Sequence, residues 1–186
     1  HRGTKARKCH TSRRDAFKSV NNPLLARVNE QGEVQMLLDD YVKRDRTRQL
    51  ELKPSFSDKV GLLKYHPGFD PKTIDWFVEN GFSGMVIEGT GLGHVNRNCF
   101  NSLRRAIDSG VLVAMASQCI WGNVRMTVYD TGRDLLSIGV IPLENMLAET
   151  ALVKMMWAFG QTSDIDKVKE IMLTNLAGEC SPRLLS

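Results

Sequence analysis

The sequence predicts an α/β protein built on a small parallel sheet. Short apolar runs with the length of buried strands occur at 60–65, 83–88 and 111–116. An amphipathic helical pattern lies between successive runs, and glycine, proline or asparagine bounds each of them. Parallel strands need crossovers of this kind, which are usually helical and right-handed.

The first crossover follows the strand at 60–65, which Pro67-Gly68 ends. Asp70 is expected to cap a helix in which Pro71 takes the first position. Asn80-Gly81 ends that helix and leads into the strand at 83–88. Together these segments make one right-handed parallel unit.

The rest of the chain continues this alternation. Its expected elements are a half-buried helix at 96–109, a short helix at 133–138 capped by Asp130 or Thr131, a very short strand at 139–142 and a helix at 146–159. The last of these is apolar nearly all round, so it must be covered on most sides, by its own sheet or by a partner chain. A final helix is predicted to begin at Ser163, with Asp166 completing a pair that resembles a capping box.

A glycine-rich turn follows the second strand, with Gly89, Gly91 and Gly93 at alternate positions before His94. Ligand sites of open α/β sheets form beyond the carboxyl ends of the strands, so the turn is a candidate site. It is not a dinucleotide cradle, because His94 stands where the third glycine would be and no helix opens directly on the turn. A tight connection without any ligand is the alternative.

Composition is that of an ordinary soluble globular chain, with 186 residues, 42% hydrophobic and 25% charged. No apolar run approaches the length of a membrane span and no signal peptide is recognisable, so we expect a cytoplasmic protein without membrane contact. The four cysteines form no Cys-x-x-Cys pair, which argues against a zinc site and fits reduced thiols.

Positive charge is concentrated at the amino terminus. Removing the six cations that precede Asp15 from the net charge of +4 leaves the remaining chain slightly acidic. We expect this segment to be a loop or an edge segment. It is a solvated charge run, a phosphate- or RNA-binding patch, or a cluster in which crowding lowers the pKa of one lysine enough for it to act as a general base.

The string from Arg2 to Lys8, followed by that from His10 to Phe17, resembles the segment that carries the catalytic lysine in the L-asparaginase family of amidohydrolases. It is most similar to the asparaginase-related D subunits of archaeal glutamyl-tRNA(Gln) amidotransferases. The likeness runs over essentially the whole chain and is most specific at 89–95 and 129–142.

The resemblance implies a fold and a domain organisation. Residues 1–28 would be the end of a large amino-terminal domain that carries the lysine segment, and 29–57 an interdomain linker. Residues 58–186 would form the small, flavodoxin-like parallel α/β domain at the carboxyl end of the asparaginase fold. The chain starts at His1 within a motif, so we expect it to be the carboxyl-terminal portion of a longer protein.

The resemblance also implies site residues. Lys8 falls where the family has its catalytic lysine, which acts with an aspartate to activate a threonine during amide hydrolysis. The family's threonines and aspartate should precede His1, so the chain alone lacks the nucleophile and is expected to be inactive. Family sites are completed by the small domain of a neighbouring subunit, which assigns Gly91, Gly93 and His94 to a substrate or cross-subunit site. Many relatives have asparagine at the position of His94.

The function implied is release of ammonia from asparagine or glutamine, which a partner amidotransferase subunit uses to convert Glu-tRNA(Gln) to Gln-tRNA(Gln). No cofactor is expected in this chain, no metal is assigned, and ATP and Mg²⁺ are expected on the partner, which also contacts most of the tRNA. A homodimer through the carboxyl-terminal domain is expected. The alternatives are a stand-alone cytoplasmic L-asparaginase and a non-catalytic dimerisation or effector-binding module.

Overall fold

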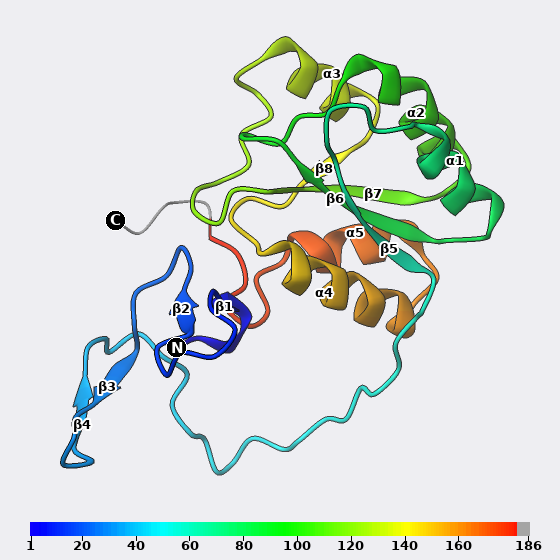
Figure 1. Cartoon of the computed structure of the whole chain (residues 1–186). Coiled ribbons are helices and arrows are strands. Elements are labelled where there is room, and N and C mark those ends of the chain that lie inside the picture. Colours follow the sequence, from blue (N-terminus) through cyan, green and yellow to red (C-terminus); the bar gives the residue numbers. More distant parts are fainter. Residues whose placement is uncertain (182–186) are drawn as a thin grey trace.

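The computed structural model describes residues 1–181 of the chain. At its centre is a four-stranded parallel sheet in which the strands lie side by side in chain order (Figure 1). The strands are β5 (Val60–Lys64), β6 (Gly84–Gly89), β7 (Leu112–Ser117) and β8 (Ile141–Pro142). The predicted α/β class with a small parallel sheet is confirmed.

Helices cover both faces of the sheet, as Figure 1 shows. One face carries α1 (Lys72–Glu79), the short 3-10 helix η2 (Arg97–Cys99) with α2 (Phe100–Asp108), and α3 (Asp130–Ser137). The other face carries α4 (Ala148–Gln161) and α5 (Ile165–Leu173). Val113 and Met115 of β7 pack into the first layer, while Leu112, Ala114 and Ala116 pack into the second. Alternate residues of a strand point to opposite faces, which is why an uninterrupted apolar run is required here.

The amino-terminal part forms two antiparallel hairpins outside the parallel sheet. After the 3-10 helix η1 (Gly3–Lys5), strand β1 (Ala6–Lys8) pairs with β2 (Phe17–Ser19), and β3 (Ala26–Val28) pairs with β4 (Val34–Met36). Each hairpin has only two strands, so both strands of each are edges. Of the two alternatives predicted for residues 1–17, a loop or an edge segment, the structure therefore has the edge segment.

An extended segment without helix or strand joins the second hairpin to β5, and its last residues, 53–57, contact α4. Trp157 Nε1 donates to the carbonyl of Lys53 (3.0 Å), and Gln161 Nε2 donates to that of Ser55 (2.8 Å). A Cβ at Gly160 would lie 2.2 Å from the Ser55 carbonyl oxygen, so this close approach requires glycine. Together the sheet and this segment cover α4 on most sides, although Val153 stays 53% exposed.

Two predicted helix starts are wrong by one residue. In α1, Pro71 is the N-cap and not the first helical residue, although Asp70 Oδ1 does accept from the Lys72 amide at 3.0 Å. In α5 the cap is Asp164 instead of Ser163, and its carboxylate accepts from two backbone amides of the first turn, at 3.1 and 3.3 Å. A carboxylate at this position is also favoured by the positive end of the helix dipole.

Candidate functional site

The glycine-rich turn closes tightly after β6. The Thr90 amide donates to the His94 carbonyl (2.9 Å) and the His94 amide donates back to the Thr90 carbonyl (3.0 Å). Between them Gly91 and Gly93 have φ of +51° and +97°, in the region that favours glycine. A Cβ on Gly89 would lie 2.9 Å from the His94 nitrogen, so the close return of the chain depends on its absence.

The loop that leaves β7 holds this turn in place. Ser117 Oγ donates to the Gly91 carbonyl (2.6 Å), and the Arg125 amide donates to the Leu92 carbonyl (2.9 Å). Gln118 Nε2 donates to two further carbonyls, one just after β5 and one in β6. The carboxyl ends of three adjacent strands are thus tied into one surface.

His94 lies against the start of α3 in its own chain. Its Nδ1 is 3.1 Å from Thr131 Oγ1, and its ring meets that of Tyr129 edge-on at 5.3 Å. Thr131 was predicted to cap α3, as was Asp130. That prediction is wrong, because Tyr129 is the N-cap without a side-chain bond and the Thr131 hydroxyl engages His94 instead.

Only one of the two ring nitrogens of His94 makes a hydrogen bond within the described residues. Its Nε2 is buried and has no hydrogen-bond partner within residues 1–181. Burial lowers the pKa of His94, so the ring is neutral at physiological pH and can donate or accept at Nε2 according to its tautomer.

Lys8 ends β1 opposite Phe17 and its side chain is exposed. Its Nζ makes no hydrogen bond or ion pair in the part of the chain that the structure describes. The nearby acid Asp15 is paired with Arg13 (2.8 Å) and Lys18 (3.1 Å), and these bonds lower the pKa of its carboxyl. The amine of Lys8 is therefore exposed and makes no polar contact with the described residues.

Lys5, in the same amino-terminal segment, has a buried Nζ. Burial lowers the pKa of Lys5 to about 8, against smaller opposing effects of Cys180 and Glu179. The cause is thus burial and not the crowding of cations that the sequence suggested.

Hydrogen bonds also join the β1–β2 hairpin, called the lysine-bearing hairpin because Lys8 ends β1, to the loop after β7 that contacts the glycine turn. Asn21 Nδ2 donates to the Gly122 carbonyl (3.1 Å), and Asn21 Oδ1 accepts from the Gly122 amide (2.9 Å). Asn21 is buried, with φ of +52°, a conformation that asparagine tolerates better than most residues. Ser117 and Arg125 thus contact the glycine turn, while Gly122, which lies between them in the chain, contacts Asn21. Sequence reasoning missed Asn21, because a pair separated by 101 positions leaves no local signal.

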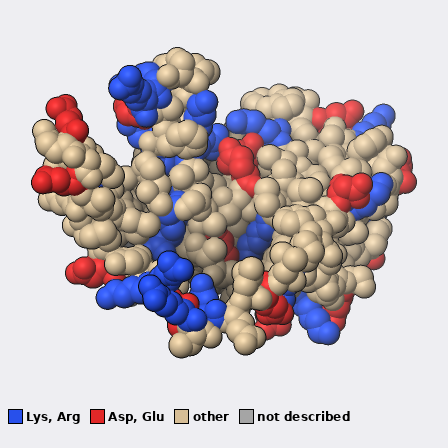
Figure 2. Space-filling view, turned by 90° about the horizontal axis from the view of Figure 1, so that it is seen from below, with Lys and Arg blue, Asp and Glu red and all other residues tan. Residues whose placement is uncertain are grey.

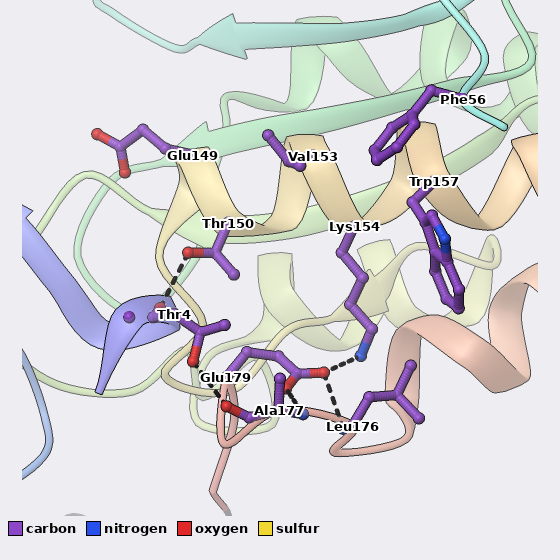
Figure 3. Close-up of a pocket in the computed structure, with 11 residues that line it drawn as sticks. Thr4, Phe56, Glu149, Thr150, Val153, Lys154, Trp157, Leu176, Ala177 and Glu179 are labelled. Atoms are coloured by element: carbon purple, nitrogen blue, oxygen red, sulfur yellow. Dashed lines mark hydrogen bonds and ion pairs between the residues drawn. The ribbon is translucent and has the colours of Figure 1, made fainter. Parts of the chain in front are cut away.

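A buried ion pair joins Lys154 of α4 to Glu179, which follows α5 in the chain (Figure 3). Lys154 Nζ contacts Glu179 Oε1 (2.5 Å) and the carbonyls of Met172 (3.2 Å) and Thr174 (2.5 Å). Glu179 also accepts from two backbone amides. Burial raises the pKa of Glu179, but these bonds outweigh it and the net shift is downward. An apolar pocket of about 550 Å³ opens beside the pair.

Figure 2 shows Lys and Arg side chains in several separate groups, not in one continuous patch, on the face that it draws. Within residues 1–181, no cluster of three or more His, Cys, Asp and Glu could hold a metal ion. The same residues contain no helix with the length and apolarity that crossing a membrane requires.

Comparison with known proteins places these features in a context. The family described as Glutaminase/Asparaginase C-terminal domain matches residues 59–172. Among curated proteins, the D subunit of the glutamyl-tRNA(Gln) amidotransferase of Pyrococcus abyssi is 50% identical over 182 residues, which are 98% of this chain and 41% of that protein. The protein of the same name from Metallosphaera sedula is 50% identical over 98% of this chain and 42% of its own length. The chain therefore spans about two fifths of these relatives.

Solved structures show the same fold. The thermostable L-asparaginase from Thermococcus kodakarensis superposes with a TM-score of 0.85 at 31% identity, over 96% of this chain and 54% of that one. L-asparaginase I from Vibrio cholerae also gives 0.85, at 27% identity over the same shares.

Proposed function

The chain belongs to the glutaminase/asparaginase family, and from this we propose that it is part of an amidohydrolase subunit that releases ammonia from asparagine or glutamine. The observation that carries the proposal is the identity of about 50%, over 98% of the chain, with proteins named as the D subunit of glutamyl-tRNA(Gln) amidotransferase. The ammonia would serve conversion of Glu-tRNA(Gln) to Gln-tRNA(Gln) by a partner subunit in the cytoplasm.

The partner would bind ATP with Mg²⁺ and most of the tRNA, while this chain needs no cofactor. The slight net negative charge of residues 15–186 supports this division, because tight binding of a nucleic-acid backbone uses many cationic contacts to phosphates.

Lys8 would act as the general base that helps to activate a threonine nucleophile. Its exposed position and uncommitted Nζ support this role. The nucleophile would come from a part of the protein outside these 186 residues, so the isolated chain should release no ammonia.

Gly91, Gly93 and His94 would complete the site of a neighbouring subunit in a homodimer. The position of the turn at the carboxyl edge of the sheet supports this. So does the open space around Gly91, which leaves room for an incoming group.

Ammonia release by the full-length protein from asparagine and glutamine tests the proposal. Lys8→Ala should lower kcat by about 10²-fold or more, the typical worth of a positioned acid-base group. Lys18→Ala is the matched control, because Lys18 is another exposed lysine of the same hairpin and should leave kcat unchanged. A change confined to KM in the Lys8 variant would instead favour a phosphate- or RNA-binding segment.

The same assay separates the alternatives. A stand-alone asparaginase would deplete asparagine but support no amidation when the partner amidotransferase chain is added. A non-catalytic module would release no ammonia from either amide.

Mixing two inactive full-length variants tests the cross-subunit role. In a mixed dimer, the Gly91→Val subunit supplies an intact Lys8 and the Lys8→Ala subunit supplies an intact glycine turn. One of the two sites then has both parts, so part of the activity should return. If subunit exchange is confirmed and none returns, the turn acts within its own chain.

A further inference from the structure

Lys5 is the most deeply buried cation of the lysine-bearing hairpin, with 1% of its surface exposed. It directly precedes β1, and its carbonyl accepts from the Val20 amide (2.8 Å) across the hairpin. Its Nζ donates to two oxygens of one residue, the carbonyl (2.6 Å) and Oδ1 (2.7 Å) of Asn145. Lys5 therefore bridges the hairpin and the connection between β8 and α4.

Asn145 is held in place to receive these bonds. Its Oδ1 also accepts from the Ser181 amide (2.9 Å), and its Nδ2 donates to Ser181 Oγ (2.9 Å). Only 2% of its surface is exposed. Both ends of the amide are engaged, so Oδ1 is held facing the amine of Lys5.

The side chains of this segment divide between two faces. Lys5 and Arg7 point toward the connection before α4 and toward α4 itself, where Arg7 pairs with Glu149 at 3.1 Å. Lys8 lies on the other face, exposed. Arg7 and Lys8 are neighbours in β1, so their side chains point to opposite faces and Lys8 points away from α4.

Neighbouring bonds hold the backbone just before Lys5. Thr4 Oγ1 donates to the Ala177 carbonyl (2.9 Å) and Thr150 Oγ1 donates to the Thr4 carbonyl (2.9 Å), as Figure 3 shows. These bonds are partly exposed and fix only the entry to the strand, whereas Lys5 reaches the interior.

We propose that Lys5 is a positioning residue for Lys8: by holding β1 against Asn145 it fixes the place and direction from which Lys8 reaches the reacting groups. This inference rests on the proposed function of Lys8. A misplacement of about 1 Å at a reacting group can cost on the order of 10² in rate, so an anchor three positions away in the chain is sufficient to control catalysis.

The anchor does not depend on the charge of Lys5. Burial lowers the pKa of Lys5 to about 8, so the amine changes charge near physiological pH. An ammonium group has three hydrogens and a neutral amine has two, and Asn145 offers two acceptors. Both forms can therefore keep both bonds.

The test uses the full-length protein, assayed for ammonia release and for hydrogen exchange of peptides within residues 5–20. Lys5→Met keeps the length of the side chain but removes both bonds. We expect kcat to fall by about 10- to 100-fold with KM changed less than about 2-fold, and exchange in the hairpin to rise. Arg7→Met is the matched control, because its exposed ion pair contributes little, and it should leave kcat within about 2-fold.

A second pair of variants covers a Lys5→Met protein that fails to fold. Asn145→Asp retains both acceptors for Lys5 and should keep kcat. Asn145→Leu removes Oδ1 and leaves only the main-chain carbonyl, so it should lower kcat, but by less than Lys5→Met does. A loss of stability alone would leave kcat of the folded protein unchanged. It would therefore not produce the expected difference in kcat between the two Asn145 variants.

An unchanged kcat in Lys5→Met, or in Asn145→Leu, overturns the proposal, as does an effect limited to KM. If the unmodified full-length protein releases no ammonia, the proposed function fails, and hydrogen exchange alone then decides on the anchor. Faster exchange of the hairpin in Lys5→Met but not in Arg7→Met retains it, and equal exchange removes it.

Discussion

Replacing Gly93 by alanine should destabilise the protein much more than the same change at Gly91, two positions earlier in the same turn. At Gly93 a Cβ would lie 2.8 Å from Val124 Cγ1 and 3.0 Å from Met115 Cγ. Both neighbours are buried, so neither can move aside without disturbing the core. At Gly91 no atom lies within 4 Å of the added carbon.

The magnitude follows from two costs. A positive φ costs an L-residue about 1–2 kcal/mol at either position, and at Gly93 overpacking adds about 1–3 kcal/mol. Reduced entropy of the unfolded chain returns roughly 0.4–1 kcal/mol in both variants. We therefore expect Gly93→Ala to lower the free energy of unfolding by about 1–5 kcal/mol and Gly91→Ala by roughly 0–1.6 kcal/mol.

Urea denaturation of the full-length variants measures this difference. With a slope of about 2 kcal/mol per molar urea, the midpoint of Gly93→Ala should lie roughly 1 M below that of Gly91→Ala. Equal midpoints, or a larger loss at Gly91, would refute the geometry of the turn. Since Gly91→Ala leaves the fold nearly intact, any loss of its activity reports on the outer surface of the turn.

Three further predictions concern the buried polar contacts, each measured by urea denaturation of the full-length protein. Glu179→Gln should lower the free energy of unfolding by about 3 kcal/mol or more, because it leaves the buried charge of Lys154 without its counter-ion; the double variant Lys154→Met with Glu179→Leu should lose less, and a larger loss in it would contradict this account. The pKa of Lys5 is lowered from 10.5 to about 8, so between pH 8 and 10.5 the unfolded chain binds more protons than the folded one. The free energy of unfolding should therefore rise with pH in this range, by at most about 1.4 kcal/mol per pH unit. If the same rise persists in Lys5→Met, another group causes it. Asn21→Ala should cost about 2 kcal/mol through loss of both bonds to Gly122, and Asn21→Gly, which relieves the positive φ, should cost less; equal losses would show that φ has no part in the effect.

Local sequence patterns were sufficient to predict the α/β architecture. The apolar runs of β5, β6 and β7 are buried on two faces, and the helices between them have a helical period, so each element could be recognised within its own few residues. Helix starts were less certain, because neighbouring polar residues compete for one capping position. The last helix was predicted to begin at Ser163, but its cap is the adjacent Asp164, and the path of the chain decides which of the two residues caps.

The tertiary structure alone decided which polar groups meet. Lys5 finds Asn145 across 140 positions and Asn21 finds Gly122 across 101, and no periodicity links residues so far apart. In the sequence Lys5 is one cation among several, and Lys154 is one of two charged residues in an otherwise largely apolar helix. Whether such a group is solvated or buried depends on what the rest of the chain places around it. Local propensity follows from neighbours along the chain, whereas a buried amine is stable only where distant segments together supply its acceptors.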